Sequence, residues 1–169
     1  MPHFLRHRFA LIFMFLGALL SPLTARSQTP ERISRVTDRA EVLSAEDSLS
    51  LARMLARYES QTTHQIAILT IPTLSGESIE AFSLRTANAW GLGCKDVNNG
   101  ILIVLVPAKR KVRIELGLGF EPYISNSQAS EIIQTQMLPA FRKKDYFKGL
   151  KNGLRELMRL GRALETPNN

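Results

Sequence analysis

Two uninterrupted apolar runs constrain the fold of this 169-residue chain more than any other feature. Residues 66–71 and 101–106 are rich in β-branched side chains and contain a single polar residue, Thr70, as is typical of strands covered on both faces. Between the two runs, apolar residues recur at helical spacing and predict a helix over residues 78–90. Gly91 and Gly93 are expected to end this helix. A strand, a helix and a strand in this order predict a crossover that leaves the two strands parallel.

The second run ends in a predicted turn over residues 107–110, with Pro107 at its start. Residues 111–116 then alternate between charged and apolar side chains, which predicts a strand with one solvated and one apolar face. Charges along one face are typical of a sheet edge, because they discourage pairing with another chain. The sequence therefore predicts an antiparallel edge hairpin.

Further elements flank this centre. Residues 36–38 are strand-like, and a helix over residues 45–59 begins at Ser44 with Asp47 in the acidic position of a capping box. A helix interrupted at Pro139 precedes a last helix over residues 146–164. Alternating strands and helices predict an α/β protein, and we expect a three-layer α/β/α sandwich around a mixed sheet of about four strands.

The first 27 residues have the composition of a secretory signal peptide, with a basic start, an apolar run and small residues before Gln28. We therefore expect export to the periplasm or beyond, a single domain over residues 28–165 and a flexible tail over residues 166–169. The leader holds three basic residues and no acidic residue, so its removal lowers the net charge from +7 to +4. Such a moderate charge on an exported protein argues against nucleic acid as a partner.

No recognisable catalytic constellation occurs in the sequence. Cys94 is the only cysteine, lacks a neighbouring histidine to activate it, and is expected to be inert and at least half-buried. His64 is the only histidine after the leader, and its place before a strand predicts a surface position. Hydrolysis would have to use metal-bound water, which makes any metal ligands decisive.

Six short segments resemble, in order, those of the TPM domain family over about residues 35–158. They are Val-Thr-Asp-Arg-Ala at 36–40 with Val-Leu-Ser at 42–44, Gln-Ile-Ala-Ile at 65–68, Ala-Trp-Gly-Leu-Gly at 89–93, Asn-Asn-Gly-Ile-Leu-Ile at 98–103, Lys-Val-Arg-Ile-Glu-Leu-Gly at 111–117, and Leu-Pro-Ala-Phe-Arg at 138–142 with Asp-Tyr at 145–146. The resemblance implies an α/β/α sandwich outside the cytoplasm, with calcium or another divalent cation bound by acidic loop residues. It also implies a weak acid phosphatase activity in some members and a helper role at a membrane complex in others.

The predicted hairpin brings the segments on either side of it, residues 96–99 and 117–121, to one end of the sheet. Calcium takes six to eight oxygen ligands, and the candidate ligands are Asp38, Asp96, Asn98, Asn99 and Glu121. Asp38 joins the others only if the first strand is reversed or very short. Many members of the family carry Asp where this chain has Asn98, so one carboxylate is missing from the expected set.

Turn chemistry alone is the other interpretation of this region. Asn-Asn-Gly favours loops, Gly117 and Gly119 permit a positive φ, and Asp38 is suited to capping a turn. On that interpretation no metal binds, and the glycines and asparagines serve only the backbone.

Six basic residues follow one stripe of the last predicted helix and its start: Lys144, Lys148, Lys151, Arg155, Arg159 and Arg162. They form either a solvated face or a weak contact with an anionic membrane surface or an acidic partner. We expect an exported TPM-type accessory domain that binds an envelope protein or membrane complex, with a divalent cation as support. The alternative is a weak, metal-dependent acid phosphatase acting on phosphomonoesters.

Overall fold

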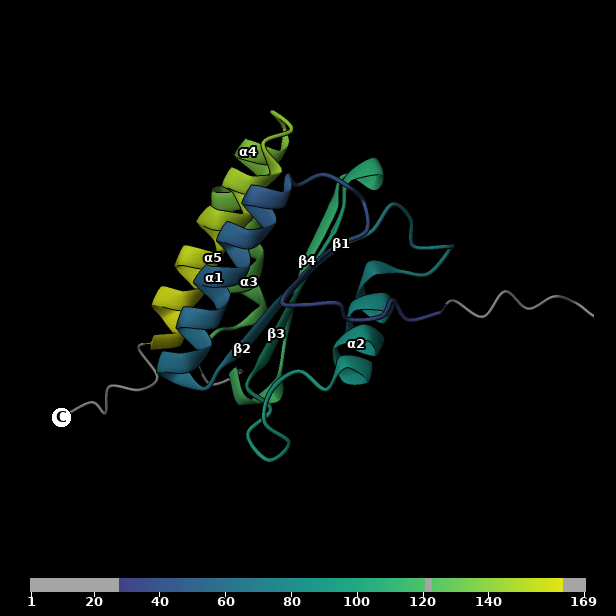
Figure 1. Cartoon of the computed structure of the whole chain (residues 1–169). Helices are drawn as coiled ribbons and strands as arrows, with labels where there is room; N and C mark the ends of the chain where they lie inside the picture. Colours follow the sequence, from purple (N-terminus) through teal and green to yellow (C-terminus); the bar gives the residue numbers. More distant parts are fainter. Residues whose placement is uncertain (1–27, 121–122, 163–169) are drawn as a thin grey trace, which may run out of the picture.

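The computed structural model describes residues 28–120 and 123–162, and its strands form one mixed sheet (Figure 1). The strands are β1 (Val36–Asp38), β2 (Gln65–Thr70), β3 (Gly100–Val106) and β4 (Lys111–Leu116), in the spatial order β1-β2-β3-β4. The first three are parallel and β4 runs antiparallel to β3. The predicted mixed sheet of four strands with an antiparallel edge hairpin is therefore confirmed.

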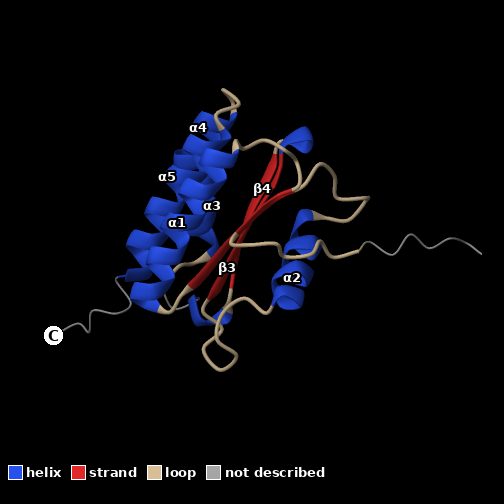
Figure 2. Ribbon diagram, in the orientation of Figure 1, coloured by secondary structure: helices blue, strands red, loops and turns tan. Residues whose placement is uncertain are grey.

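Helices cover both faces of the sheet, but unequally (Figure 2). Among the described residues, one face carries α1 (Ala45–Thr62), α3 (Asn126–Ile132), α4 (Leu138–Phe141) and α5 (Tyr146–Arg162), and the other face carries only α2 (Ile79–Trp90). A π-helical turn, Ile133–Met137, joins α3 to α4 just before Pro139. The three-layer sandwich is confirmed, and its thin layer leaves part of the sheet uncovered.

The two apolar runs are continuous because each central strand buries both of its sides. Ile66, Ile68 and Ile103 pack toward α1, α3 and α5, whereas Leu69 and Val104 pack toward α2. Successive side chains of a strand point to opposite faces, so a strand between two helical layers needs apolar residues at every position. All seven residues of β3 are buried.

A serine caps the N-terminus of each of the helices α1, α2 and α3. Ser44 accepts the N–H of Asp47 at 3.0 Å, Ser78 accepts that of Ala81 at 3.1 Å, and Ser125 forms a full capping box with Gln128. The cap at Ser44 is as predicted, but α1 continues three residues beyond its expected end. Its last turn persists because Leu55, Tyr58 and Thr62 are buried against the sheet.

The segment before β1 crosses α2 and is fastened to it. The indole N–H of Trp90 donates to the carbonyl of Pro30 at 2.7 Å, and Arg85 donates to the hydroxyl of Thr29. A hydrogen bond to Glu77 raises the pKa of the Arg85 guanidinium above its usual range. Residues 28–35 therefore belong to the folded domain, while the predicted leader and tail lie outside the described residues.

Within residues 28–120 and 123–162, no helix combines the length and the hydropathy needed to cross a bilayer.

Candidate functional site

Asp38, one of the five predicted metal ligands, lies at the wrong end of the sheet to join the others. It pairs with Thr70 in a parallel ladder, whereas Asn98 and Asn99 precede the start of β3. Thr70 lies opposite Leu105 of β3, which is five residues beyond Gly100 at the start of the strand. At about 3.3 Å per residue, Asp38 is therefore roughly 17 Å from the start of β3. Its inclusion depended on a first strand that is reversed or very short. The strand β1 is short, with three residues, but it runs parallel to β2 and so still leaves Asp38 at the far end.

The Asp38 carboxylate instead holds the loop before α1. It accepts the N–H of Leu43 at 2.9 Å and that of Val42 at 3.4 Å, together with the hydroxyl of Thr70. These contacts match the turn-capping role that the sequence left open for this residue.

The loops before β3 and after β4 do lie together, as the hairpin predicted. Gly117 donates its N–H to Gly100 at 2.8 Å, and Gly119 donates to the carbonyl of Asn98 at 3.1 Å. A Cβ added at Gly117 or Gly119 would stand only 2.1 Å from the carbonyl oxygen of Asn98 or Val97. The glycines are therefore required by backbone packing rather than by a positive φ.

Asn99 ties these loops to the rest of the sheet. Its amide oxygen accepts the N–H of Cys94 at 2.7 Å and its amide nitrogen donates to the carbonyl of Thr63 at 3.2 Å. The side chain is buried, so a cation would have to displace a hydrogen bond to reach the Asn99 oxygen. Asn98, at φ +51°, and Asp96 are exposed, while Glu121 lies outside the described residues.

The residues that the structure describes do not by themselves complete a calcium shell at this end. They contain no group of three or more His, Cys, Asp or Glu side chains placed to hold a metal, and Asp96 supplies one carboxylate. Calcium commonly combines several carboxylates with carbonyls and water. The metal site stays a prediction that depends on Asp96, Asn98 and Glu121, and so does metal-dependent phosphatase chemistry.

Two single residues differ from their expected environments. His64 is buried, with its Nδ1 3.1 Å from the Tyr58 hydroxyl and its ring edge-on to Phe120 at 4.9 Å between centroids. Cys94 is exposed, because its loop turns outward around two hydrogen bonds to the Cys94 carbonyl. Neither outcome follows from neighbours in sequence, since Phe120 reaches His64 only through the tertiary fold.

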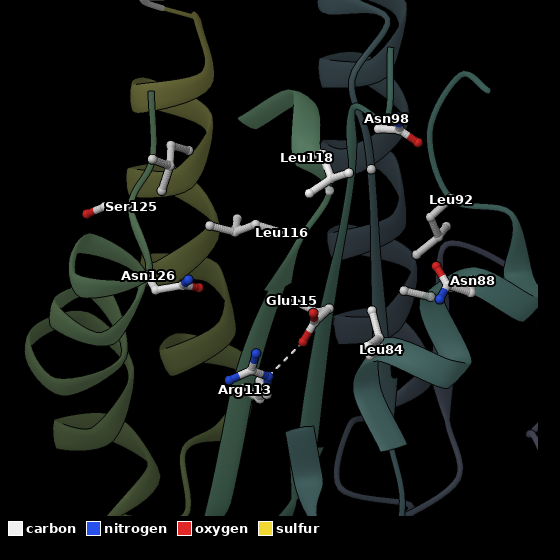
Figure 3. A pocket seen from close by; sticks show the side chains of 14 residues that line it. Leu84, Asn88, Leu92, Asn98, Arg113, Glu115, Leu116, Leu118, Ser125 and Asn126 are labelled. Atoms are coloured by element: carbon white, nitrogen blue, oxygen red, sulfur yellow. Dashed lines mark hydrogen bonds and ion pairs between the residues drawn. The ribbon is translucent and has the colours of Figure 1, made fainter. Parts of the chain in front are cut away.

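A groove of about 620 Å³ lies between α2 and β4, where the single helix leaves the sheet uncovered. Figure 3 shows Arg113 and Glu115 of β4 on its floor, Leu84 and Asn88 of α2 along one side, and Asn126 on the other. Sequence reasoning missed this groove, because only the relative placement of α2 and β4 creates it.

The charged face predicted for β4 is half-buried rather than fully solvated. The guanidinium of Arg113 contacts the Glu115 carboxylate at 2.7 Å, with side chains 30% and 13% exposed. Partly exposed pairs of this kind contribute at most about 1 kcal/mol to stability. Their stronger effect is to give the groove a polar floor in which the two charges balance.

The outer edge of β4 is open along the groove. The hydrogen bond from Gly117 to Gly100 fixes the alternation of the ladder, so the backbone groups of Val112, Ile114 and Leu116 point away from β3. No described residue hydrogen-bonds these outward groups. A second hollow of about 330 Å³ shares Arg113 and Asn126 with the groove and continues along the same edge.

Large apolar side chains gather around this open edge. Of the six that are exposed in the described residues, Leu84 and Leu118 line the groove, and Val97 and Tyr123 immediately precede the lining residues Asn98 and Ile124. Leu118 is 66% exposed. Grouped exposed apolar side chains typically mark an interaction surface, whereas single ones are ordinary.

Comparisons with known proteins agree with this architecture. The N-terminal domain of a protein from P. gingivalis has a TM-score of 0.71 and 34% identity, covering 80% of this chain and 87% of that chain. The BA42 protein from Bizionia argentinensis (TM-score 0.64, 16% identity, covering 75% and 86%) and an N-terminal domain from Corynebacterium glutamicum (0.59, 15%, covering 84% and 89%) share the fold.

No curated protein matches the chain. The TPM domain family model matches residues 36–160, which include the whole sheet, the groove and almost all of α5. The chain belongs to the TPM domain family.

Proposed function

We propose that this protein is an exported accessory domain that binds an extended segment of an envelope protein against the open edge of β4. The observation that carries the proposal is the row of unpaired outward backbone groups on β4, bordered by a groove and by exposed apolar side chains. Strand addition of this kind obtains affinity from main-chain hydrogen bonds and specificity from pockets for alternate side chains.

The two flanks of the edge define the chemistry of the segment that would fit. On the α2 side, Leu84 and Leu118 offer apolar contact above the balanced Arg113–Glu115 pair. On the α3 side, Ala129 and Ile133 line the second hollow. An extended segment with apolar side chains and little net charge matches both flanks better than a strongly acidic or basic one.

The opposite edge of the sheet is a poorer candidate. The strand β1 has three residues, and short edge strands are one way in which proteins avoid unwanted pairing. The six residues of β4 offer twice that length, and the paired Arg113 and Glu115 side chains line the groove.

Site-specific crosslinking tests the proposal. Replacing Cys94 with Ser leaves one introduced thiol, so a photo-crosslinker can be attached at Leu118→Cys in the groove or, as a matched control, at Leu49→Cys, an exposed leucine of α1. We expect a discrete adduct with an envelope protein from position 118 and none from position 49.

A backbone variant separates strand pairing from simple apolar contact. Leu116→Pro removes an outward N–H without touching the ladder to β3, whereas Leu116→Ala removes the side chain and keeps the N–H. We expect the proline variant to lose the adduct and the alanine variant to retain most of it, with both folded by circular dichroism. Equal adducts from the two variants, or from positions 118 and 49, would contradict the proposal.

A further inference from the structure

A second cavity, of about 320 Å³, lies at the far end of the sheet from the glycine loops. It is formed where the β3–β4 turn meets the α4–α5 turn, and Figure 1 shows both turns at the same end of the domain. The volume falls at the lower limit of pockets that hold small ligands. None of the predicted metal ligands that the structure describes lines this cavity, and of the outward residues of the β4 edge only Val112 does.

The rim of this cavity is cationic. Arg110 ends the first turn and Lys111 begins β4, while Arg142 and Lys144 come from the second turn. All four side chains are exposed, and none forms an ion pair or side-chain hydrogen bond with another described residue. Lys109 and Lys143, which are also exposed, adjoin them in sequence.

No acid of the described part of the chain lines the cavity to neutralise this charge. The nearest in sequence, Asp145, accepts the N–H of Lys148 at 3.0 Å and so caps the start of α5. Arg110 and Lys144 have φ values of +51° and +60°, which non-glycine residues adopt at a cost. Two strained turns thus hold four uncompensated cations around one opening.

The floor of the cavity is apolar, which distinguishes it from a site for a simple inorganic anion. Leu105, Leu138 and Phe141 line it, with Tyr146 beside Phe141 at 5.7 Å between ring centroids. A ligand that fits both the cationic rim and the apolar floor carries a negatively charged group next to an apolar group. Tyrosine side chains are also enriched where proteins meet the headgroup level of a bilayer.

Among the basic residues of α5, Lys148 lies in the first turn close to the lining residue Tyr146, whereas Arg155 lies near the middle of the helix. Lys148 and Arg155 are exposed, but Arg159 pairs with Glu156 at 2.6 Å and Arg162 donates to Gln61 at 3.1 Å. The hydrogen bond from Arg159 also lowers the pKa of Glu156, which favours the charged pair. The basic stripe predicted from the sequence is therefore compensated at Arg159 and Arg162, and its beginning, at Lys144, lines the cavity.

We propose that this cavity binds the phosphate of an anionic phospholipid headgroup, with the apolar floor against the adjoining glycerol and chain, so that this end of the domain docks on an anionic membrane surface. Guanidinium groups suit phosphate through paired hydrogen bonds, and further basic side chains nearby suit a charged plane more than a single ion.

Sedimentation with vesicles of phosphatidylcholine, with or without phosphatidylglycerol, tests this. The double variant Lys111→Gln and Arg142→Gln should lower the affinity for anionic vesicles about 25-fold, since each basic side chain contributes about fivefold. The matched pair Arg57→Gln and Lys95→Gln removes the same charge from exposed sites at the other end of the sheet and should change affinity far less. Equal losses in the two pairs, or equal binding to neutral vesicles, would overturn the proposal.

Two further measurements identify the docked face and the source of the phosphate. In Tyr146→Trp, the emission of the new indole should shift to the blue when anionic vesicles are added, relative to the parent with Trp90 alone. Binding without that shift would mean that another face docks. Saturation of the cavity by glycerol phosphate without any binding to anionic vesicles would assign the site to a soluble anion and overturn the membrane proposal.

Discussion

The two ends of the sheet hold their loops by different physical means. Where β3 begins and β4 ends, glycines let backbones approach closely and the neutral amide of Asn99 bridges Cys94 to Thr63. Where β1 and β2 end, the charged carboxylate of Asp38 gathers two amides and a hydroxyl. The glycine end has almost no room for an added atom, whereas the other end depends on the single side chain of Asp38, which a substitution can shorten.

This contrast bears on the metal prediction. The sequence grouped acids and amides from both ends into one ligand set, but the end where Gly117 and Gly119 pack against the carbonyls of Asn98 and Val97 is held by its own backbone contacts. A cation there would add to loops that are already fixed. Substitutions at the two ends therefore separate structural roles from metal-binding roles.

The largest effect should come from Gly117→Ala at the glycine end. Its new Cβ would meet the carbonyl oxygen of Asn98 at 2.1 Å, and neither backbone can move without breaking the ladder, so we expect a loss of about 3 kcal/mol or more in the free energy of unfolding. Urea denaturation measures it. Gly76→Ala is the control, because at φ +88° it has open space around it and should cost only about 1 to 2 kcal/mol; equal losses would refute the close-packing argument.

Asn99→Ala should have the next largest effect, at the same end. It leaves the Cys94 N–H and the Thr63 carbonyl without their side-chain partner, and unsatisfied buried groups cost about 1 to 3 kcal/mol. We expect a loss of about 2 kcal/mol by thermal or urea unfolding. Asn98→Gly, at the exposed neighbour with φ +51°, should be close to neutral, and a comparable loss there would show that the loop as a whole is sensitive.

Asp38→Ala probes the other end and should cost about 1.5 kcal/mol, because three donors lose a partly buried acceptor. Asp38→Asn should lose less, since its amide oxygen still accepts. The same alanine variant should leave calcium binding, measured by calorimetry, unchanged from the parent. A weaker calcium affinity in Asp38→Ala would restore this residue to the ligand set.

The smallest expected change in energy is a gain of metal affinity in Asn98→Asp. Adding the carboxylate that many family members carry raises the ligand charge, which tunes calcium affinity in such sites, and we expect about a tenfold tighter calcium Kd by calorimetry. The double variant Asp96→Ala and Glu121→Ala should show no calcium heat. If Asn98→Asp and the parent give identical titrations, the glycine end is architecture alone.

The predicted strands and helices were largely correct because the sequence pattern reports burial directly. An apolar residue at every position of 101–106 requires cover on both sides, and β3 is covered on both sides. The errors fall on residues whose surroundings come from distant parts of the chain. His64 is buried by Phe120, 56 positions away, and Asp38 is placed by the direction of β1 against β2.

The sequence by itself determined the mixed sheet, its parallel centre and its antiparallel edge, because hydrophobic periodicity and turn residues act over a few positions. Only the tertiary structure decided which loops meet, how far α2 extends over β4, and where uncompensated cations collect. Those features depend on packing between elements that are far apart in the chain. Both proposed binding surfaces are of this second kind. The sequence indicated the edge strand and the basic stripe that begins at Lys144, but neither the groove nor the cavity beside them.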